Sequence, residues 1–225
     1  MRSLFLAWVL ALACASAAVA KPTVRPGVTF FAATPRASAP VVLRDRPGGH
    51  ALASLGSRTQ FGSPETVGVA VQRGNWVGVI TTNLPNGVLG WVPRKELALT
   101  PVAWAINVSL SRHLLVLRHG GKVVHTARIA IGARSSPTPT GRYVITDHID
   151  PGAQRGTYGC CILALSGHQP HPPAGWSRDQ DWRLAIHGGG GIGSDVSAGC
   201  LHADENTLRL LMRLTPLGTP VTIAR

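Results

Sequence analysis

Short β-type runs separated by tight-turn signals fill residues 40–99, and this pattern constrains the fold more than any other feature. Val, Ile and Trp are frequent in these runs, and such residues suit a pleated, half-buried surface. The runs are PVVL at 40–43, VGVAV at 67–71, WVGVI at 76–80 and GWV at 90–92. Turn signals built from Gly, Pro and Asn separate them. We therefore expect a small all-β barrel with Trp76 and Trp91 in its core.

A second block, residues 102–225, opens with a two-residue alternation. Trp104, Ile106, Val108 and Leu110 alternate with smaller or polar residues, as a half-buried strand requires. A tight hairpin turn is expected at 119–122. Further strands are expected at 114–117, 123–131, 142–146 and 220–223. The chain as a whole is therefore expected to be mainly β.

One helix is expected in this block, after the loop that carries Cys200. Asp204 is a suitable N-cap, and Leu208, Leu211 and Met212 follow at the spacing of a buried helical stripe. The region 150–182 is different, because it is rich in Gly and Pro and has little periodicity. We expect it to be a long loop of functional importance.

The amino-terminal residues predict export. Arg2 precedes an apolar run over residues 4–13, and small residues ending in AVA lead to Ala20. This order is typical of a secretory signal peptide over residues 1–20. Residues 21–39 are rich in Pro, Ala and Thr and read as a spacer. The apolar run is too short for a membrane span, and no later segment is long and apolar enough for one.

The charge balance points to a polyanionic partner. The chain has a formal net charge of +12, which falls to +11 without residues 1–20. Nucleic acid is the usual partner of such a basic surface, but aromatic residues are too sparse for a base-stacking platform. Export favours anionic polymers of the cell wall instead.

Three cysteines remain in the mature chain: Cys160, Cys161 and Cys200. An exported protein normally pairs its thiols, so an odd number leaves at least one unpaired. Adjacent cysteines can bridge only through a strained ring, and we therefore expect Cys160 and Cys161 both to stay reduced. Catalysis by Cys200 would account for an unpaired thiol.

The segment HGGGGIGSDVSAGCLH, residues 187–202, concentrates the chemistry. It holds His187 and Cys200 in a glycine-rich loop ahead of the expected helix. A thiol becomes a good nucleophile when a nearby base ionises it. Glycine lets backbone N–H groups turn toward a developing oxyanion. The segment thus contains a minimal acyl-transfer site.

The order of motifs resembles the L,D-transpeptidase catalytic domain of bacterial cell-wall synthesis. The motifs are TPTG at 138–141, LSG at 165–167, AIHG at 185–188, SAGC at 197–200 and GTPV at 218–221. The resemblance covers residues 102–225, and residues 40–99 resemble a bacterial SH3-like module. It implies a β-rich catalytic domain acting on peptidoglycan stem peptides, with neither a metal nor an organic cofactor.

The resemblance also implies residue roles. Cys200 would attack the carbonyl between a diamino acid and D-Ala in a tetrapeptide stem, with His187 as base. A thioester would form with release of D-Ala, and the amine of a second stem would resolve it into a cross-link. The backbone at Gly199 and Cys200 would hold the oxyanion, and Ser197 and Gly188 would orient the imidazole. In addition, Tyr158 and His202 are expected to contact substrate. Trp176 is a further wall candidate; packing explains Tyr158 equally well and Trp176 better.

Several alternatives remain open. The family often has His where this chain has Ala198, and usually Arg or Asn where it has His202. A decayed wall-binding protein is therefore one alternative, and an L,D-carboxypeptidase using water as acceptor is another. A zinc site built from His187, Cys200 and His202, completed by Cys160 or Cys161, is a weaker hypothesis, because the ligand spacing is irregular.

Overall fold

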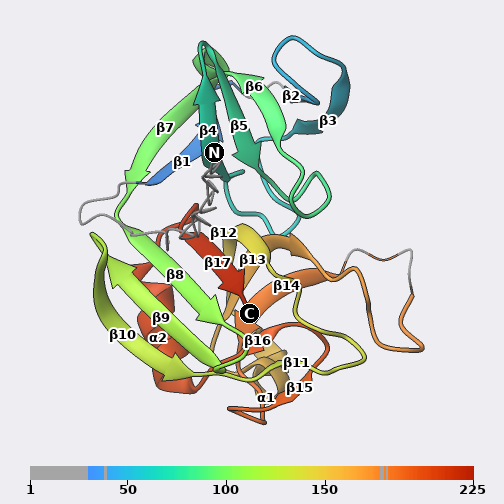
Figure 1. The fold of residues 1–225 in the computed structure, drawn as a ribbon, viewed down its shortest axis with the longest axis vertical. Helices are drawn as coiled ribbons and strands as arrows, with labels where there is room; N and C mark the ends of the chain where they lie inside the picture. Colours follow the sequence, from blue (N-terminus) through green and yellow to red (C-terminus); the bar gives the residue numbers. More distant parts are fainter. Residues whose placement is uncertain (1–29, 38–39, 178–179, 181) are drawn as a thin grey trace, which may run out of the picture.

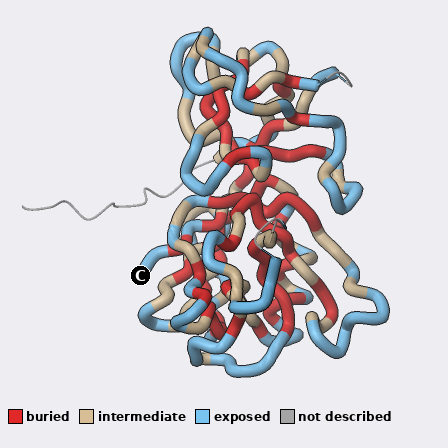
Figure 2. The backbone as a smooth tube through the Cα atoms, turned by 90° about the vertical axis from the view of Figure 1, so that its right-hand side faces the viewer, coloured by how far each residue is buried: buried red, intermediate tan, exposed pale blue. Residues whose placement is uncertain are grey.

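The computed structural model describes residues 30–37, 40–177, 180 and 182–225. Two large β-sheets dominate this part of the chain, one above the other in Figure 1. Buried segments run through both (Figure 2). The expected mainly β fold is confirmed, whereas the expected signal peptide at 1–20 lies outside the described residues.

The N-terminal sheet has the strand order β3-β2-β6-β5-β4-β1-β7 over the described residues. Its elements are β1 (Phe30–Pro35), β2 (Val41–Arg44), β3 (Ala51–Leu55), β4 (Val67–Arg73), β5 (Trp76–Ile80), β6 (Gly90–Pro93), the 3-10 turn η1 (Arg94–Glu96) and β7 (Leu97–Val102). Its core contains Leu43, Leu55, Val77, Val79 and Leu97. Of the two tryptophans expected in the core, Trp91 is buried and Trp76 is partly exposed.

Strand β1 corrects the expected spacer at 21–39. Residues 30–35 pair antiparallel with β7 along their whole length and with β4 at Ala32 and Ala33. Their composition carries no strand alternation, so long-range pairing, rather than local pattern, makes this segment a strand.

The C-terminal sheet has the order β10-β9-β8-β17-β12-β13-β14-β16 in the described part of the chain. Its strands are β8 (Trp104–Ser109), β9 (Leu114–His119), β10 (Lys122–Arg128), β12 (Gly141–Ile149), β13 (Ile162–His168), β14 (Arg183–His187), β16 (Leu201–His202) and β17 (Pro220–Ala224). A separate pair is formed by β11 (Ile131–Gly132) and β15 (Asp195–Ser197). Short turns are η2 (Gly152–Gln154) and the one-turn helix α1 (Arg155–Tyr158).

The expected helix is α2 (Glu205–Leu214). The Asp204 carboxylate accepts a hydrogen bond from the Thr207 N–H, which satisfies a free donor of the first turn. Leu208 and Leu211 are buried in the core of the C-terminal sheet, and Met212 packs against that core.

Strand β13 corrects the expected loop at 150–182. Residues 162–168 lie between β12 and β14 in the sheet, and five consecutive residues are buried. A strand buried on both faces shows no polar alternation, so the sequence pattern alone does not predict it.

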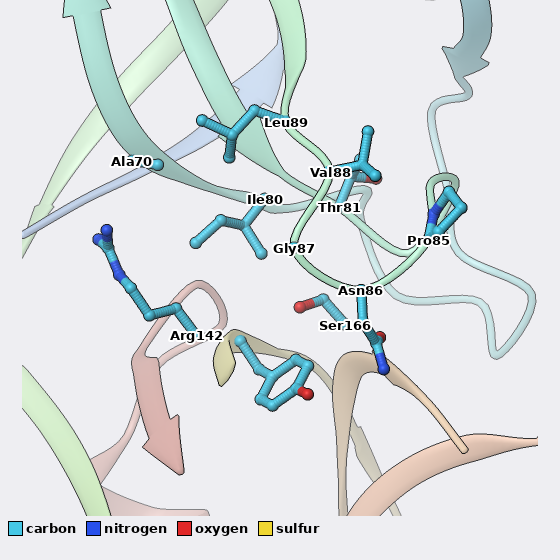
Figure 3. A pocket seen from close by; sticks show the side chains of 11 residues that line it. Ala70, Ile80, Thr81, Pro85, Asn86, Gly87, Val88, Leu89, Arg142 and Ser166 are labelled. Carbon is cyan, nitrogen blue, oxygen red and sulfur yellow. The ribbon is translucent and has the colours of Figure 1, made fainter. Parts of the chain in front are cut away.

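The two sheets are closely joined. Gly68 in β4 lies so near β12 that an added Cβ would be 2.4 Å from Val144. The Asn86 side chain exchanges two hydrogen bonds with the backbone of His168, at 2.8 and 2.9 Å. Beside this contact lies a cavity of about 240 Å³, lined from one sheet by Ile80 and Leu89 and from the other by Arg142 (Figure 3). The sheets therefore share an interface on which both contribute side chains.

Candidate active site

A cavity of about 560 Å³ opens at the end of the C-terminal sheet where β14 and β16 lie side by side. Parallel pairing sets His187 opposite His202, and Cys200 comes directly before β16. The cavity lining includes Phe61, Asp150, Gln154, Tyr158, Gln169, Trp176, Trp182, Arg183, His187, Cys200 and His202. The parallel pairing of β14 and β16 thus brings the thiol and the imidazole to one cavity.

The imidazole of His187 is buried and oriented. Its Nδ1 lies 2.5 Å from the carbonyl oxygen of Gly188. A carbonyl oxygen only accepts, so Nδ1 carries the proton and Nε2 is the basic nitrogen. Burial lowers the pKa of His187 to about 4; the hydrogen bond to Gly188 raises it, and the ring of His202 lowers it further.

The thiol of Cys200 faces the backbone of β14. Its Sγ lies 3.9 Å from the carbonyl oxygen of Arg183. Burial raises the pKa of the thiol to about 11, and a hydrogen bond with the Ala185 backbone acts in the opposite direction. At neutral pH the resting pair is therefore a protonated thiol and a neutral imidazole.

The loop before Cys200 is fixed by buried hydroxyl groups. The Ser197 Oγ donates to the Cys200 carbonyl at 2.6 Å and accepts from the Gly199 N–H at 3.1 Å. The Thr138 Oγ1 donates to the Gly199 carbonyl at 2.8 Å and accepts from the Gly132 N–H at 2.8 Å. The TPTG motif thus contributes a hydrogen bond to the cysteine loop.

Gly199 occupies a position that excludes a side chain. Its φ is +117°, and an added Cβ would lie 1.9 Å from Nε2 of Gln169. The Gln169 amide is itself held in place, because its Nε2 donates to the Ala198 carbonyl at 3.0 Å and to Ser136 Oγ at 3.1 Å. This explains the glycine directly before the cysteine.

The residues expected to orient the imidazole or to hold the oxyanion make different contacts in the structure. Gly188 contacts the imidazole, as expected for an orienting group. Ser197 does not, since its hydroxyl bonds to the Cys200 loop instead. Of the two expected oxyanion donors, the Gly199 N–H already donates to Ser197 Oγ. The expected oxyanion donors therefore reduce to the Cys200 N–H.

Tyr158 and His202 both pack against His187. The Tyr158 ring meets the imidazole edge-on at 5.0 Å between centroids, and the His202 ring lies 4.8 Å away. His202 Nδ1 lies 3.0 Å from the Gly190 carbonyl oxygen, which fixes the ring. Trp176 also lines the cavity and packs against Trp182 at 4.2 Å.

The cysteine expectation needs one correction. Cys160 and Cys161 are bonded to each other, so they are not both reduced. The bond lies at the turn between α1 and β13, directly after Gly159, which has φ +73°. Cys200 is the free cysteine of the described ranges. The bridged cysteines cannot complete a zinc site, and no group of three or more His, Cys, Asp and Glu residues in the described part could hold a metal ion.

Sequence reasoning missed several lining residues, among them Phe61, Gln169, Trp182 and Arg183. Trp182 directly precedes β14 and Arg183 is its first residue, so both lie next to the AIHG motif. Phe61 comes from the N-terminal sheet's β3–β4 connection, and no local pattern links it to Cys200. Its position depends on how the two sheets meet.

A free thiol and an oriented, neutral imidazole line the same cavity, and these are the two groups that a cysteine-histidine acyl-transfer centre uses. The family model described as the L,D-transpeptidase catalytic domain, YkuD, matches residues 103–223. This match covers more than half of the chain, and the chain therefore belongs to that family.

One sequence relative agrees with this assignment. Over 128 residues, the chain is 31% identical to the YkuD protein of Bacillus subtilis (strain 168), which carries an L,D-transpeptidase name; the match covers 55% of this chain and 68% of that protein. A solved L,D-transpeptidase from Mycobacterium smegmatis is 12% identical, covering 63% of this chain and 76% of its own, with a TM-score of 0.42. The catalytic domain of an Enterococcus faecium L,D-transpeptidase is 21% identical, covering 54% and 96%, with a TM-score of 0.38.

None of the helices in the described ranges has the length and apolar character to cross a membrane.

Proposed function

We propose that this protein is an L,D-transpeptidase that forms peptidoglycan cross-links by cysteine acyl transfer. The observation that carries the proposal is the shared cavity of Cys200 and His187, in which the Gly188 carbonyl leaves Nε2 of the imidazole as the base. Family membership supplies the substrate class, which is the peptide stem of peptidoglycan.

The first half-reaction breaks one amide and forms a thioester. His187 Nε2 takes the Cys200 thiol proton as Sγ attacks the carbonyl carbon between the diamino acid and D-Ala. Because the thiol and imidazole pKa values, about 11 and about 4, disfavour an ion pair in the resting site, proton transfer accompanies the attack. The imidazolium then protonates the amine of D-Ala, which leaves.

The oxyanion formed in this attack needs a donor. The Cys200 N–H is suited to this role, since it belongs to the nucleophile's own residue and the neighbouring Gly199 N–H already donates to Ser197. One such donor contributes roughly 3–4 kcal/mol to the transition state in other enzymes. Thr138 and Ser197 support it indirectly by fixing the backbone on both sides of Gly199.

The second half-reaction restores the enzyme. The side-chain amine of another stem attacks the thioester carbonyl, and neutral His187 accepts the proton that this amine loses. Collapse of the intermediate expels the Cys200 thiolate, which regains its proton from the imidazolium. The product is an amide cross-link, with no change in oxidation state.

Location and organisation follow the same proposal. A signal peptide at residues 1–20 would deliver the protein to the cell envelope, where the +11 charge of the mature chain would favour anionic wall polymers. Residues 30–102 would form an SH3-like domain, preceding a catalytic domain at 102–225. This boundary extends the expected domain at 40–99 by including β1 and β7.

Product analysis with a tetrapeptide donor and an amine acceptor tests the reaction. The expected products are D-Ala and a cross-linked dimer, and both should disappear in Cys200→Ala and His187→Ala. Shortened monomer without dimer would identify an L,D-carboxypeptidase. If the folded wild type forms neither D-Ala nor dimer, the result would favour a decayed wall-binding protein.

A further inference from the structure

The turn at residues 57–64, between β3 and β4, is a rigid structure built from its own hydrogen bonds. The Thr59 N–H donates to the Ser63 carbonyl at 2.9 Å, and the Gly62 N–H donates to the Thr59 carbonyl at 3.0 Å. The Arg58 guanidinium donates to the Gly62 carbonyl at 2.6 Å. Gly62, with φ +87°, allows the chain to close in this way. The turn therefore presents its tip, Phe61, in a fixed position.

The same turn is attached to the C-terminal sheet. The Thr59 hydroxyl donates to the carboxylate of Asp147, a fully buried residue of β12. The next residue after the turn, Glu65, is also buried. In Figure 1 the β3–β4 connection descends from the N-terminal sheet toward β12 and β13. The turn thus belongs to one sheet but is held by the other.

Phe61 reaches the catalytic cavity from this position. Its side chain lines the same cavity as Cys200 and His187, although it is 48% exposed. The Arg183 guanidinium lies 5.9 Å from the Phe61 ring centre, and the Arg183 carbonyl accepts the Cys200 thiol. Only one residue therefore separates the ring from the nucleophile.

We propose that the turn at 57–64 is a substrate-recognition element of the acyl-donor site, with Phe61 as its specificity-determining residue. The ligand is a peptide stem whose aliphatic and amide surface packs on the phenyl ring. This inference rests on the proposed function for the identity of the ligand. The proposal also gives the N-terminal sheet a role in the site, because the β3–β4 connection of this sheet forms part of the cavity wall.

The physical argument is one of burial and preorganisation. A phenyl ring that is half exposed to water gains free energy when a ligand covers it. The turn is already ordered, so little conformational entropy is lost on binding. The ring contacts neither the thiol nor the imidazole, and its contribution should therefore appear in substrate binding rather than in the chemical step.

Equilibrium binding tests this without depending on turnover. A synthetic tetrapeptide stem, with a diamino acid followed by D-Ala, is titrated calorimetrically into the full chain carrying Cys200→Ala. Adding Phe61→Ala should weaken the Kd about tenfold, and Phe61→Tyr should restore it. Phe31→Ala is the matched control, because Phe31 is 42% exposed in the same sheet and does not line the cavity.

The outcomes separate the two proposals. An unchanged Kd in Phe61→Ala, an equal loss in Phe31→Ala, or no stem binding at all would overturn the recognition role. If binding depends on Phe61 but the wild type releases no D-Ala, the recognition role stands and the proposed reaction fails. In an active wild type, the Phe61→Ala loss should appear in KM and not in kcat.

Discussion

The Nδ1 of His187 lies 2.5 Å from the carbonyl oxygen of Gly188. This one contact assigns the proton to Nδ1 and leaves Nε2 as the base, without an acidic side chain as orienting group. The N–H of Gly188 donates to the Tyr158 carbonyl at 2.6 Å, and this hydrogen bond fixes the Gly188 backbone. The imidazole is therefore oriented by main chain that is itself held in place.

Burial of this imidazole predicts an unusual pH profile. A His187 pKa near 4 keeps the base neutral well below the ordinary histidine range. The kcat/KM for D-Ala release should therefore stay level from about pH 8 down to about pH 5 and fall only near pH 4. An acid limb near pH 6.5 would contradict the buried, neutral base.

Substitution of His202 should move that limb. The His202 ring lies 4.8 Å from His187 and lowers its pKa. In His202→Ala the neighbouring imidazole is lost and water reaches the site, and both changes raise the pKa of His187. We expect the acid limb of kcat/KM to shift to higher pH. A shift to lower pH, or none, would argue against coupling between the two rings.

The Thr138 hydroxyl should be necessary for the cysteine loop. Thr138→Val keeps the shape but removes two buried hydrogen bonds, to Gly199 and from Gly132. We expect a loss of about 1–3 kcal/mol in unfolding free energy and about tenfold slower acylation of Cys200. Thr138→Ser, which retains the hydroxyl, should recover most of both. If folded Thr138→Val acylates Cys200 at the wild-type rate, the Thr138 hydroxyl is not needed for the cysteine loop.

Gly199 and Gly190 offer a contrast within one loop. Gly199→Ala places a Cβ against Gln169 at a positive φ, whereas an added Cβ at Gly190 meets no atom within 4 Å. Gly199→Ala should destabilise the protein by about 2 kcal/mol or more and abolish acylation. Gly190→Ala should change neither substantially. Chemical denaturation and acylation rates measure both, and similar behaviour of the two variants would refute the steric argument.

Glu65 should make stability depend on pH. Burial, followed by the charge of Asp147, raises its pKa from 4.5 to about 6, against a smaller opposing effect of Arg183. Between pH 4.5 and about 6, the folded state therefore binds more protons than the unfolded state. The free energy of unfolding consequently falls by about 2 kcal/mol as the pH rises through this range. Glu65→Gln should be more stable than the wild type at pH 7 but not at pH 4.5. Urea unfolding measures this, and the same difference in unfolding free energy between the two proteins at both pH values would contradict the prediction.

Local signals explain which elements were predictable. Helix α2 begins at a side-chain cap and buries a regular stripe, and both features are written within a few residues of Asp204. Strands β1 and β13 were missed because neither alternates. The first becomes a strand by pairing with β7, and the second is buried on both faces of the sheet.

The site divides in the same way. His187 and Cys200 share one glycine-rich segment, so their association could be predicted from spacing and residue type. Phe61 could not be, because only the contact between the two sheets brings it to the cavity. Ser197 was assigned to the wrong partner, since nothing in its spacing distinguishes a hydroxyl that supports the loop from one that supports the imidazole.

The most direct test of the account is intact-mass analysis of the reduced full-length protein after incubation with a carbapenem, an acylating probe suggested by family membership. We predict a single adduct on Cys200 in the wild type, much slower adduct formation in His187→Ala, and none in folded Cys200→Ala. An unmodified wild type, or equal modification of Cys200→Ala, would contradict the claim that Cys200 is the acyl-transfer nucleophile.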